Sequence, residues 1–257
     1  MFLACNFRRI DLPTEDLSHL IKILNTQGEV YTYKREISLD EENLELKILV
    51  RSRASTVVGK LIEVYYEDFV YIHTISHEKK EVESKRAKTT FGPFYIHLFD
   101  KEPLKNYMGF LTRKIISTRL STIFSQLLTI KLSRRVIPFR QIRILITQKE
   151  KEIRDIDDFH NVSEVIIEDI EDQYVDWAWM KGSMLDLSEE YTKYIQRGGK
   201  VRSLAIEFRG RTYYLYNDGR IYTKQADTSS LTRISSEIGY FYEIAKRLQE
   251  IGAFTVI

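Results

Sequence analysis

The most regular hydrophobic pattern of this chain lies near its C-terminal end. Apolar residues there recur at steps of three and four positions, the spacing of one face of a helix. These residues are Leu231, Ile234, Ile238, Phe241, Ala245 and Leu248. The pattern predicts an amphipathic helix that ends at Gly252.

Strand patterns precede this helix. Runs rich in Val, Ile and Tyr predict four strands, which are Val162 to Ile170, Val201 to Phe208, Arg211 to Tyr216 and Arg220 to Lys224. A short helix, Leu187 to Ile195, separates the first two and closes at Gly198-Gly199. Gly210 joins the next pair, and the tight-turn signal Asn217-Asp218-Gly219 makes the last two strands a hairpin.

The first part of the chain is richer in strands. The strand Phe2 to Ile10 leads to a predicted helix with one apolar face, formed by Leu17, Leu20, Ile21 and Leu24, and a stop at Gly28. Strand-type runs follow at Glu29 to Ile37, Leu44 to Arg51, Val57 to Tyr66, Phe69 to Ile75 and Phe94 to Phe99. Between the last two, the charged and polar segment Ser76 to Thr90 indicates a solvated loop or a hairpin tip.

After Pro103 the apolar residues recur with the spacing of a helix. The apolar positions are Leu104, Met108, Leu111, Ile115, Leu120, Ile123 and Leu127. They predict one long helix or two helices that break near Thr118, and the polar positions make it basic through Lys105, Arg113, Lys114 and Arg119. A strand from Gln141 to Thr147 follows Pro138.

Charge is unevenly distributed, although the formal net charge is only +2. Lys101 to Arg143 holds ten Lys or Arg residues against one acid, whereas Glu152 to Glu190 holds thirteen acids against two basic residues. The two segments either form a basic and an acidic face or pair with each other. Together with the element order, this shift predicts an α+β fold in two lobes, residues 1–145 and 146–257, with the first lobe ending in the basic helix.

The composition and the apolar runs of the chain indicate whether it folds and where in the cell it is located. The content of 43% hydrophobic and 30% charged residues is typical of chains that fold around cores. No apolar run is long enough for a membrane-spanning helix, and the first residues become charged too early for a signal peptide. We therefore expect a cytoplasmic protein without membrane contact, in which the single cysteine, Cys5, is buried.

The segment RSLAIEFRGRTYYLYNDGRIYTKQADTSSLTRISSEIGYFYEIAKRLQEIGAF, from Arg202 to Phe254, resembles the second part of a TATA-binding-protein repeat. The shared features are a strand, a strand that ends in a turn with Gly219 before basic Arg220, a return strand, a polar connector and a long helix. With the preceding strand and helix, the resemblance covers roughly 90 of the 257 residues. It implies that the C-terminal lobe is a curved antiparallel sheet backed by helices.

Alternation assigns the two faces of the hairpin. Leu215 and Ile221 point to the helix, whereas the opposite face carries Tyr214, Tyr216, Tyr222 and Lys224. In the TATA-binding-protein family the equivalent face contacts the DNA minor groove with wedged Phe side chains. Here Tyr216 takes one aromatic position and Tyr222 replaces a small aliphatic residue, and bulky tyrosines suit stacking on unpaired bases, or contact with protein, at least as well.

Signals for catalysis are sparse. Glu45 and Lys47, with Asp40 as a partner acid, match the Glu-x-Lys element of metal-dependent nucleases, but alternation also places both on an ordinary solvent face. The five histidines lack metal-ligand spacing, and no phosphate loop, dinucleotide fingerprint or nucleophile elbow occurs. Trp177 and Trp179 favour packing in a core or an interface over ligand stacking.

The leading hypothesis is therefore a non-catalytic, nucleic-acid-associated accessory protein without cofactor or metal, binding single-stranded or duplex nucleic acid. Its candidate contacts are Tyr214, Tyr216, Tyr222, Lys224, Arg220, Arg113, Lys114, Arg119, Arg134 and Arg135. The alternative is a protein-interaction adaptor or structural subunit, with a protein partner or a second copy on the same face. A metal-dependent nuclease is the third hypothesis.

Overall fold

The computed structural model describes residues 3–11, 28–36, 43–76, 81–128, 131–136, 159–172, 174–250 and 255–256. The strands are β1 (Leu3–Asp11), β2 (Glu29–Glu36), β3 (Asn43–Thr56), β4 (Gly59–Ser76), β5 (Glu81–Phe99), β6 (Tyr107–Leu111), β7 (Lys131–Val136), β8 (Phe159–Glu168), β9 (Trp177–Lys181), β10 (Lys200–Phe208), β11 (Arg211–Tyr216), β12 (Arg220–Thr223) and β13 (Thr255–Val256). The helices are α2 (Lys114–Leu128), α4 (Glu189–Gln196) and α5 (Leu231–Glu250), with a 3-10 turn, η1, at Leu185–Leu187. The protein is thus α+β in class.

One antiparallel sheet runs through the described part of the chain, in the order β2-β3-β4-β5-β6-β1-β12-β11-β10-β8-β9. The first strand lies in its middle, because β1 pairs with β6 on one side and with β12 on the other. β7 pairs with the end of β1, and β13 pairs with β7. The predicted boundary between residues 145 and 146 falls outside the described residues and stays a prediction.

Register shows which helix covers which face of the sheet, since directly paired residues point to the same side. Cys5 pairs with Ile221, and both are buried in the core that contains Phe241 of α5. Asn6 pairs with Arg220 on one neighbour and with Phe110 on the other, so these lie on the opposite face. There Phe110 meets Phe124 of α2 edge to face, with ring centroids 6.4 Å apart.

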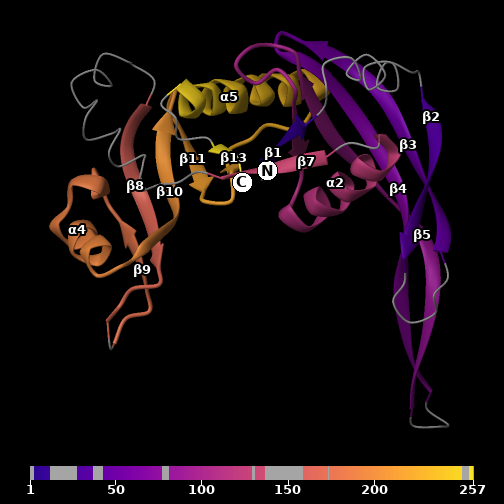
Figure 1. Ribbon diagram of the computed structural model, residues 1–257, viewed down its shortest axis with the longest axis horizontal. Helices are drawn as coiled ribbons and strands as arrows, with labels where there is room; N and C mark the ends of the chain where they lie inside the picture. The colour runs from indigo at the N-terminus through magenta and orange to yellow at the C-terminus, as the bar shows by residue number, and fades with distance from the viewer. Residues whose placement is uncertain are drawn as a thin grey trace.

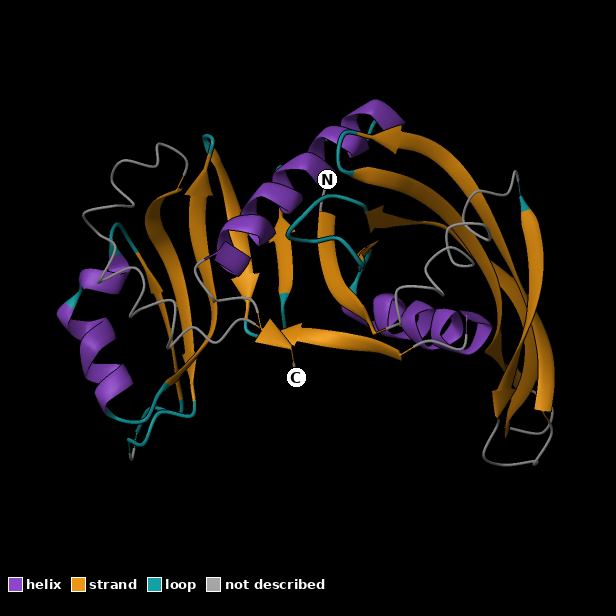
Figure 2. Cartoon of the chain, turned by 45° about the horizontal axis from the view of Figure 1, so that its top comes forward, coloured by secondary structure: helices purple, strands orange, loops and turns teal. Residues whose placement is uncertain are grey.

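The two helices therefore cover opposite faces of the same sheet. Figures 1 and 2 show α5 along the outer side of a curved arch and α2 inside it, under the strands of the N-terminal part. Leu215 and Ile221 are buried on the α5 side, which confirms the faces predicted for the hairpin. Cys5 is fully buried as expected.

The predicted helix from Leu104 is wrong in its first part. Tyr107–Leu111 is strand β6, and the helix starts at Lys114 and runs unbroken to Leu128. All five residues of β6 are buried between β5 and β1, so the strand lacks the alternation that marks a half-exposed strand. Leu120 and Ile123 are buried on α2, as predicted.

The predicted loop from Ser76 to Thr90 is also wrong over most of its length. The runs Val57 to Tyr66 and Phe69 to Ile75 belong largely to one long strand, β4, and β5 pairs with it from Ser76 and Glu81 onward. A ladder of backbone hydrogen bonds with a neighbouring strand holds these polar residues extended. The residues between Ser76 and Glu81 lie outside the described part of the chain.

The remaining elements follow the sequence closely. Predicted strands at the start of the chain, at Glu29, at Leu44 and throughout the C-terminal part are present, as are α4 and the last helix. Gly210 and Gly219 have φ angles of 71° and 79°, so both turns use the left-handed conformation that glycine adopts without strain. The predicted helix at Leu17 to Leu24 and the strand at Gln141 to Thr147 lie outside the described residues.

Candidate functional site

Five of the predicted contact residues meet on one surface, the face of β11 and β12 opposite α5. We name it the tyrosine face, and it consists of Tyr214, Tyr216, Arg220, Tyr222 and Lys224. Tyr214 and Tyr222 are directly paired across the hairpin, and their ring centroids are 5.6 Å apart at 49°. Burial raises the pKa of Tyr222, which keeps the hydroxyl protonated.

The two cations of the tyrosine face lie over tyrosine rings. The guanidinium carbon of Arg220 is 4.0 Å from the centroid of the Tyr216 ring. The ammonium of Lys224 is 4.7 Å from the centroid of the Tyr214 ring, and its hydrogen bond with the Tyr214 hydroxyl raises the pKa of Lys224. The surface therefore combines flat apolar rings with fixed positive charge.

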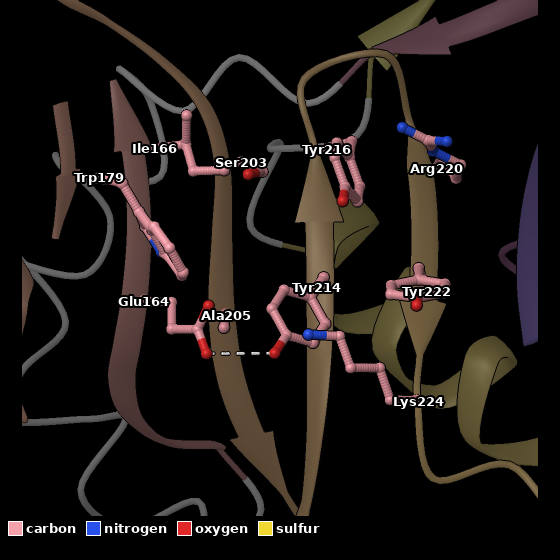
Figure 3. A pocket seen from close by; sticks show the side chains of 10 residues that line it. All are labelled: Glu164, Ile166, Trp179, Ser203, Ala205, Tyr214, Tyr216, Arg220, Tyr222 and Lys224. Atoms are coloured by element: carbon pink, nitrogen blue, oxygen red, sulfur yellow. Dashed lines mark hydrogen bonds between the residues drawn. The ribbon is translucent and has the colours of Figure 1, made fainter. Parts of the chain in front are cut away.

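A hollow of about 320 Å³ adjoins the tyrosine face. Figure 3 shows its lining, with the small residues Ser203 and Ala205 of β10 between the tyrosines and Trp179. Ala205 pairs with Glu164 and Tyr214, and Ser203 pairs with Ile166 and Tyr216. Because small side chains stand between large ones on the neighbouring strands, the surface is depressed along β10. We name this depression the aromatic hollow.

Of the two environments predicted for Trp177 and Trp179, packing in the core is wrong, and packing in an interface stays a prediction. They are 62% and 59% exposed, on β9 at one end of the sheet. Alternation on this strand turns both indoles outward, and it turns Ala178 and Met180 toward the core. The spacing of two residues could have placed both indoles on one face, but only the pairing of β9 with β8 brings Trp179 to the hollow.

Glu164 is a charged lining residue that the sequence did not indicate, and the other lining residues not indicated are Ile166, Trp179, Ser203 and Ala205. It lies on β8, and its side chain is only 16% exposed. Its Oε1 accepts a hydrogen bond from the Tyr214 hydroxyl at 3.2 Å, across Ala205 in Figure 3, and lies 3.4 Å from Nζ of Lys181. An acid thus sits within a surface whose other charged groups are positive.

The predicted basic residues outside the hairpin are dispersed. Lys114 pairs with Asp218 in the β11–β12 turn at 2.8 Å, and Arg119 pairs with Asp68 of β4 at 2.7 Å. Arg113 is exposed just before α2. Arg134 and Arg135 lie on β7, next to β1 and β13, and their side chains are outside the described part. Among those predicted basic residues whose side chains are described, Lys114 alone is brought to the edge of the tyrosine face.

Asp218 links the turn to both elements around it. Burial alone would raise the pKa of its carboxyl group, but the hydrogen bond from Lys114 and the charge of Arg220 together lower it below its usual value. Asp218 is therefore charged at neutral pH. The ion pair with Lys114 ties the start of α2 to the hairpin that carries the tyrosine face.

The described residues give little support to a nuclease site or to a metal site. Glu45 and Lys47 are both exposed on β3, the backbone N–H of Lys47 donates to the Glu67 carboxylate at 2.7 Å, and Asp40 lies outside the described residues. No cluster of three or more His, Cys, Asp or Glu side chains within the described ranges is arranged to hold a metal ion. None of the described helices has the length and apolar character needed to cross a membrane.

Comparison with known proteins does not distinguish between a nucleic-acid-binding protein, a protein-interaction adaptor and a nuclease. No protein family matches this chain, and no curated protein is a recognisable relative. The function therefore has to be argued from the geometry of the tyrosine face and the aromatic hollow.

Proposed function

We propose that this protein binds single-stranded nucleic acid on the tyrosine face and the aromatic hollow. The observation that carries the proposal is the combination of Trp179, Tyr214 and Tyr216 around a depression, with Arg220 and Lys224 over the tyrosine rings. Proteins that bind single strands use aromatic rings on which bases stack and nearby cations that follow the phosphates. The surface offers both.

The covering of the sheet favours a single strand over a duplex. Arg220 and Phe110 lie on the same face, and α2 covers that face at Phe110. A duplex that straddled the whole concave face, as in the TATA-binding-protein family, would collide with α2. A single strand needs only the open part between β9 and β12.

The resemblance to the TATA-binding-protein family supports the proposal only through the architecture of the sheet and its helix. A curved antiparallel sheet with a long helix across its outer side fits that resemblance. The chemistry of the face differs, because Tyr222 stands where the family has a small aliphatic residue and the aromatic hollow lies beside it. We therefore propose a TATA-binding-protein-like architecture with a different mode of binding.

Fluorescence anisotropy with labelled single-stranded DNA, single-stranded RNA and duplex DNA, each at low and moderate salt, tests the proposal. We expect saturable binding of one single-stranded form, weaker at higher salt because phosphate contacts release counterions. Tyr216→Ala combined with Tyr222→Ala should weaken it at least about tenfold, since each stacked base contributes about 1–3 kcal/mol.

Tyr71→Ala is the matched control, because Tyr71 is an exposed tyrosine on β4 that does not line the hollow. It should bind as tightly as the unmodified protein. Flat anisotropy traces at micromolar protein in low salt, or full affinity in the double variant, would contradict the proposal.

A protein partner is the second candidate for the same surface. Within the described sheet, β9 has a paired strand on one side only, and it carries both exposed tryptophans. An open strand edge with apolar side chains can take up a strand of another chain. Under this alternative the tyrosine double variant changes the assembly state measured by light scattering, and nucleic acid does not bind.

A further inference from the structure

The most unusual group in the aromatic hollow is the carboxylate of Glu164. It forms part of one row across the sheet, in which Lys181, Glu164, Ala205, Tyr214 and Tyr222 are successive neighbours. A carboxylate repels the phosphates of a nucleic acid. In a surface proposed to bind nucleic acid, the Glu164 carboxylate must therefore contact a group other than the sugar-phosphate backbone. Bases supply such partners through their N–H groups.

The hydrogen bonding of Glu164 is incomplete. Its two contacts, from the Tyr214 hydroxyl and from Lys181, both involve Oε1. No described residue donates a hydrogen bond to Oε2. An ionised carboxylate has only acceptor sites, and Oε2 is left to accept hydrogen bonds from water or from a ligand. The hollow therefore has a place for a ligand that presents N–H groups.

The Watson–Crick edges of the bases differ in how well they fit this acceptor. Guanine presents two adjacent donors, N1–H and the N2 amino group. Adenine and cytosine place a ring-nitrogen acceptor next to their amino group, and thymine or uracil flanks its single N3–H with two carbonyl oxygens. A carboxylate attracts both donors of guanine and is repelled by the acceptors of the other bases.

We infer that the aromatic hollow selects an unpaired guanine, with the Glu164 carboxylate accepting hydrogen bonds from N1–H and the N2 amino group. This inference rests on the proposed function, because it specifies the base that the single strand places in the hollow. Ser203 and Ala205 leave the space, Trp179 and Tyr216 flank it with rings, and Arg220 complements the O6 oxygen and the phosphates. Pairing in a duplex occupies the same edge of guanine, so the inference also requires a single strand.

Binding of an oligonucleotide series by the unmodified protein tests the inference. The probes are fluorescein-labelled oligothymidylates about 12 nucleotides long, either unchanged or with one central guanine, adenine, cytosine or hypoxanthine. We expect guanine to raise the affinity about tenfold over thymine, because hydrogen bonds to a charged group discriminate strongly. Hypoxanthine should fall between them, since it keeps N1–H and lacks the N2 amino group.

Glu164→Gln tests which residue reads the base. Glutamine has nearly the same shape but one acceptor oxygen and no charge, so the ratio of guanine to thymine affinity should fall to about one. Glu168→Gln is the control, because Glu168 lies on the same strand, pairs with Arg202 at 3.6 Å and does not line the hollow. This control should keep the ratio of the unmodified protein.

The outcomes separate the inference from the proposed function. Equal affinity for all probes overturns guanine selection and leaves single-strand binding intact, whereas no binding of any probe overturns both. A guanine preference that survives in Glu164→Gln excludes Glu164 as the reader and overturns the inference. The probe series on the unmodified protein is decisive even if Glu164→Gln does not fold.

Discussion

His97 is a titratable residue that the fold holds in its neutral form. Its side chain is fully buried, Nε2 lies 2.9 Å from the Thr56 hydroxyl, and the ring centroid is 4.5 Å from that of Phe99. Nδ1 is buried and has no hydrogen-bond partner in the described structure. Burial lowers the pKa of His97 to about 3, since the charged imidazolium would lose its hydration there.

This burial predicts a pH-dependent stability. The unfolded chain binds a proton at His97 below its ordinary pKa of about 6.5, whereas the folded chain does not until about pH 3. Acid therefore favours the unfolded state in this window. His97→Gln keeps an amide group for Thr56 and does not titrate, so between about pH 6 and pH 4 the stability of the unmodified protein should fall relative to the variant by about 1.4 kcal/mol per pH unit.

Urea denaturation of both proteins across this pH range measures the difference. All other titrating groups are common to the two proteins, so they cancel in the comparison. A constant difference between pH 6 and pH 4 would mean that His97 is protonated in the folded protein, contrary to the effect of its burial.

At the residue scale, part of the site follows from the sequence and part does not. Alternation in a hairpin is local, so the sequence alone places Tyr214, Tyr216 and Tyr222 on one face. Glu164 and Trp179 come from β8 and β9, which reach the hollow only through the pairing of distant strands. Nothing in their own segments indicates that neighbourhood.

At the element scale, β6 shows how a buried strand can imitate a helix. Leu104, Met108 and Leu111 have helical spacing, and the true helix α2 follows after only two residues. A strand buried on both faces carries apolar residues at every position, so any period can be found in it. The opposite error at Ser76 to Thr90 arose because a long exposed ribbon needs no apolar face to stay paired.

Packing of α2 is predicted to depend on Phe124. Its side chain is 1% exposed and contacts Phe110 of β6. Phe124→Ala removes this contact and leaves a cavity between helix and sheet, which should lower the free energy of unfolding by about 3–5 kcal/mol. Urea denaturation followed by far-UV circular dichroism measures the loss.

Ile115→Ala is the control on the same helix, because Ile115 is 85% exposed. It should change the free energy of unfolding by no more than about 0.5 kcal/mol. Equal losses in the two variants would contradict a specific role for the contact between Phe124 and the sheet.

At the scale of the whole molecule, contacts between the first and last parts of the chain are extensive. The β1–β12 pairing makes the sheet continuous, and β13 pairs with β7. α5 spans the junction, since Tyr242 donates a hydrogen bond to the backbone carbonyl of Glu102 and its ring lies 5.9 Å from that of Phe99. For one part of the chain to be stable by itself, the pairing of β1 with β12 would have to be lost and the core beneath α5 would have to be divided.

We therefore predict that the chain unfolds as one cooperative unit, although its charge pattern favours two lobes. The only two tryptophans, Trp177 and Trp179, report on β9 at one end of the sheet, whereas circular dichroism reports on all elements. The urea midpoints from the two signals should coincide. Phe124→Ala, far from β9 in the strand order, should shift the tryptophan midpoint as much as the dichroism midpoint, because a single unit transmits the loss throughout. A tryptophan midpoint that stays in place while the dichroism transition splits would establish that residues 146–257 form a separately folding lobe.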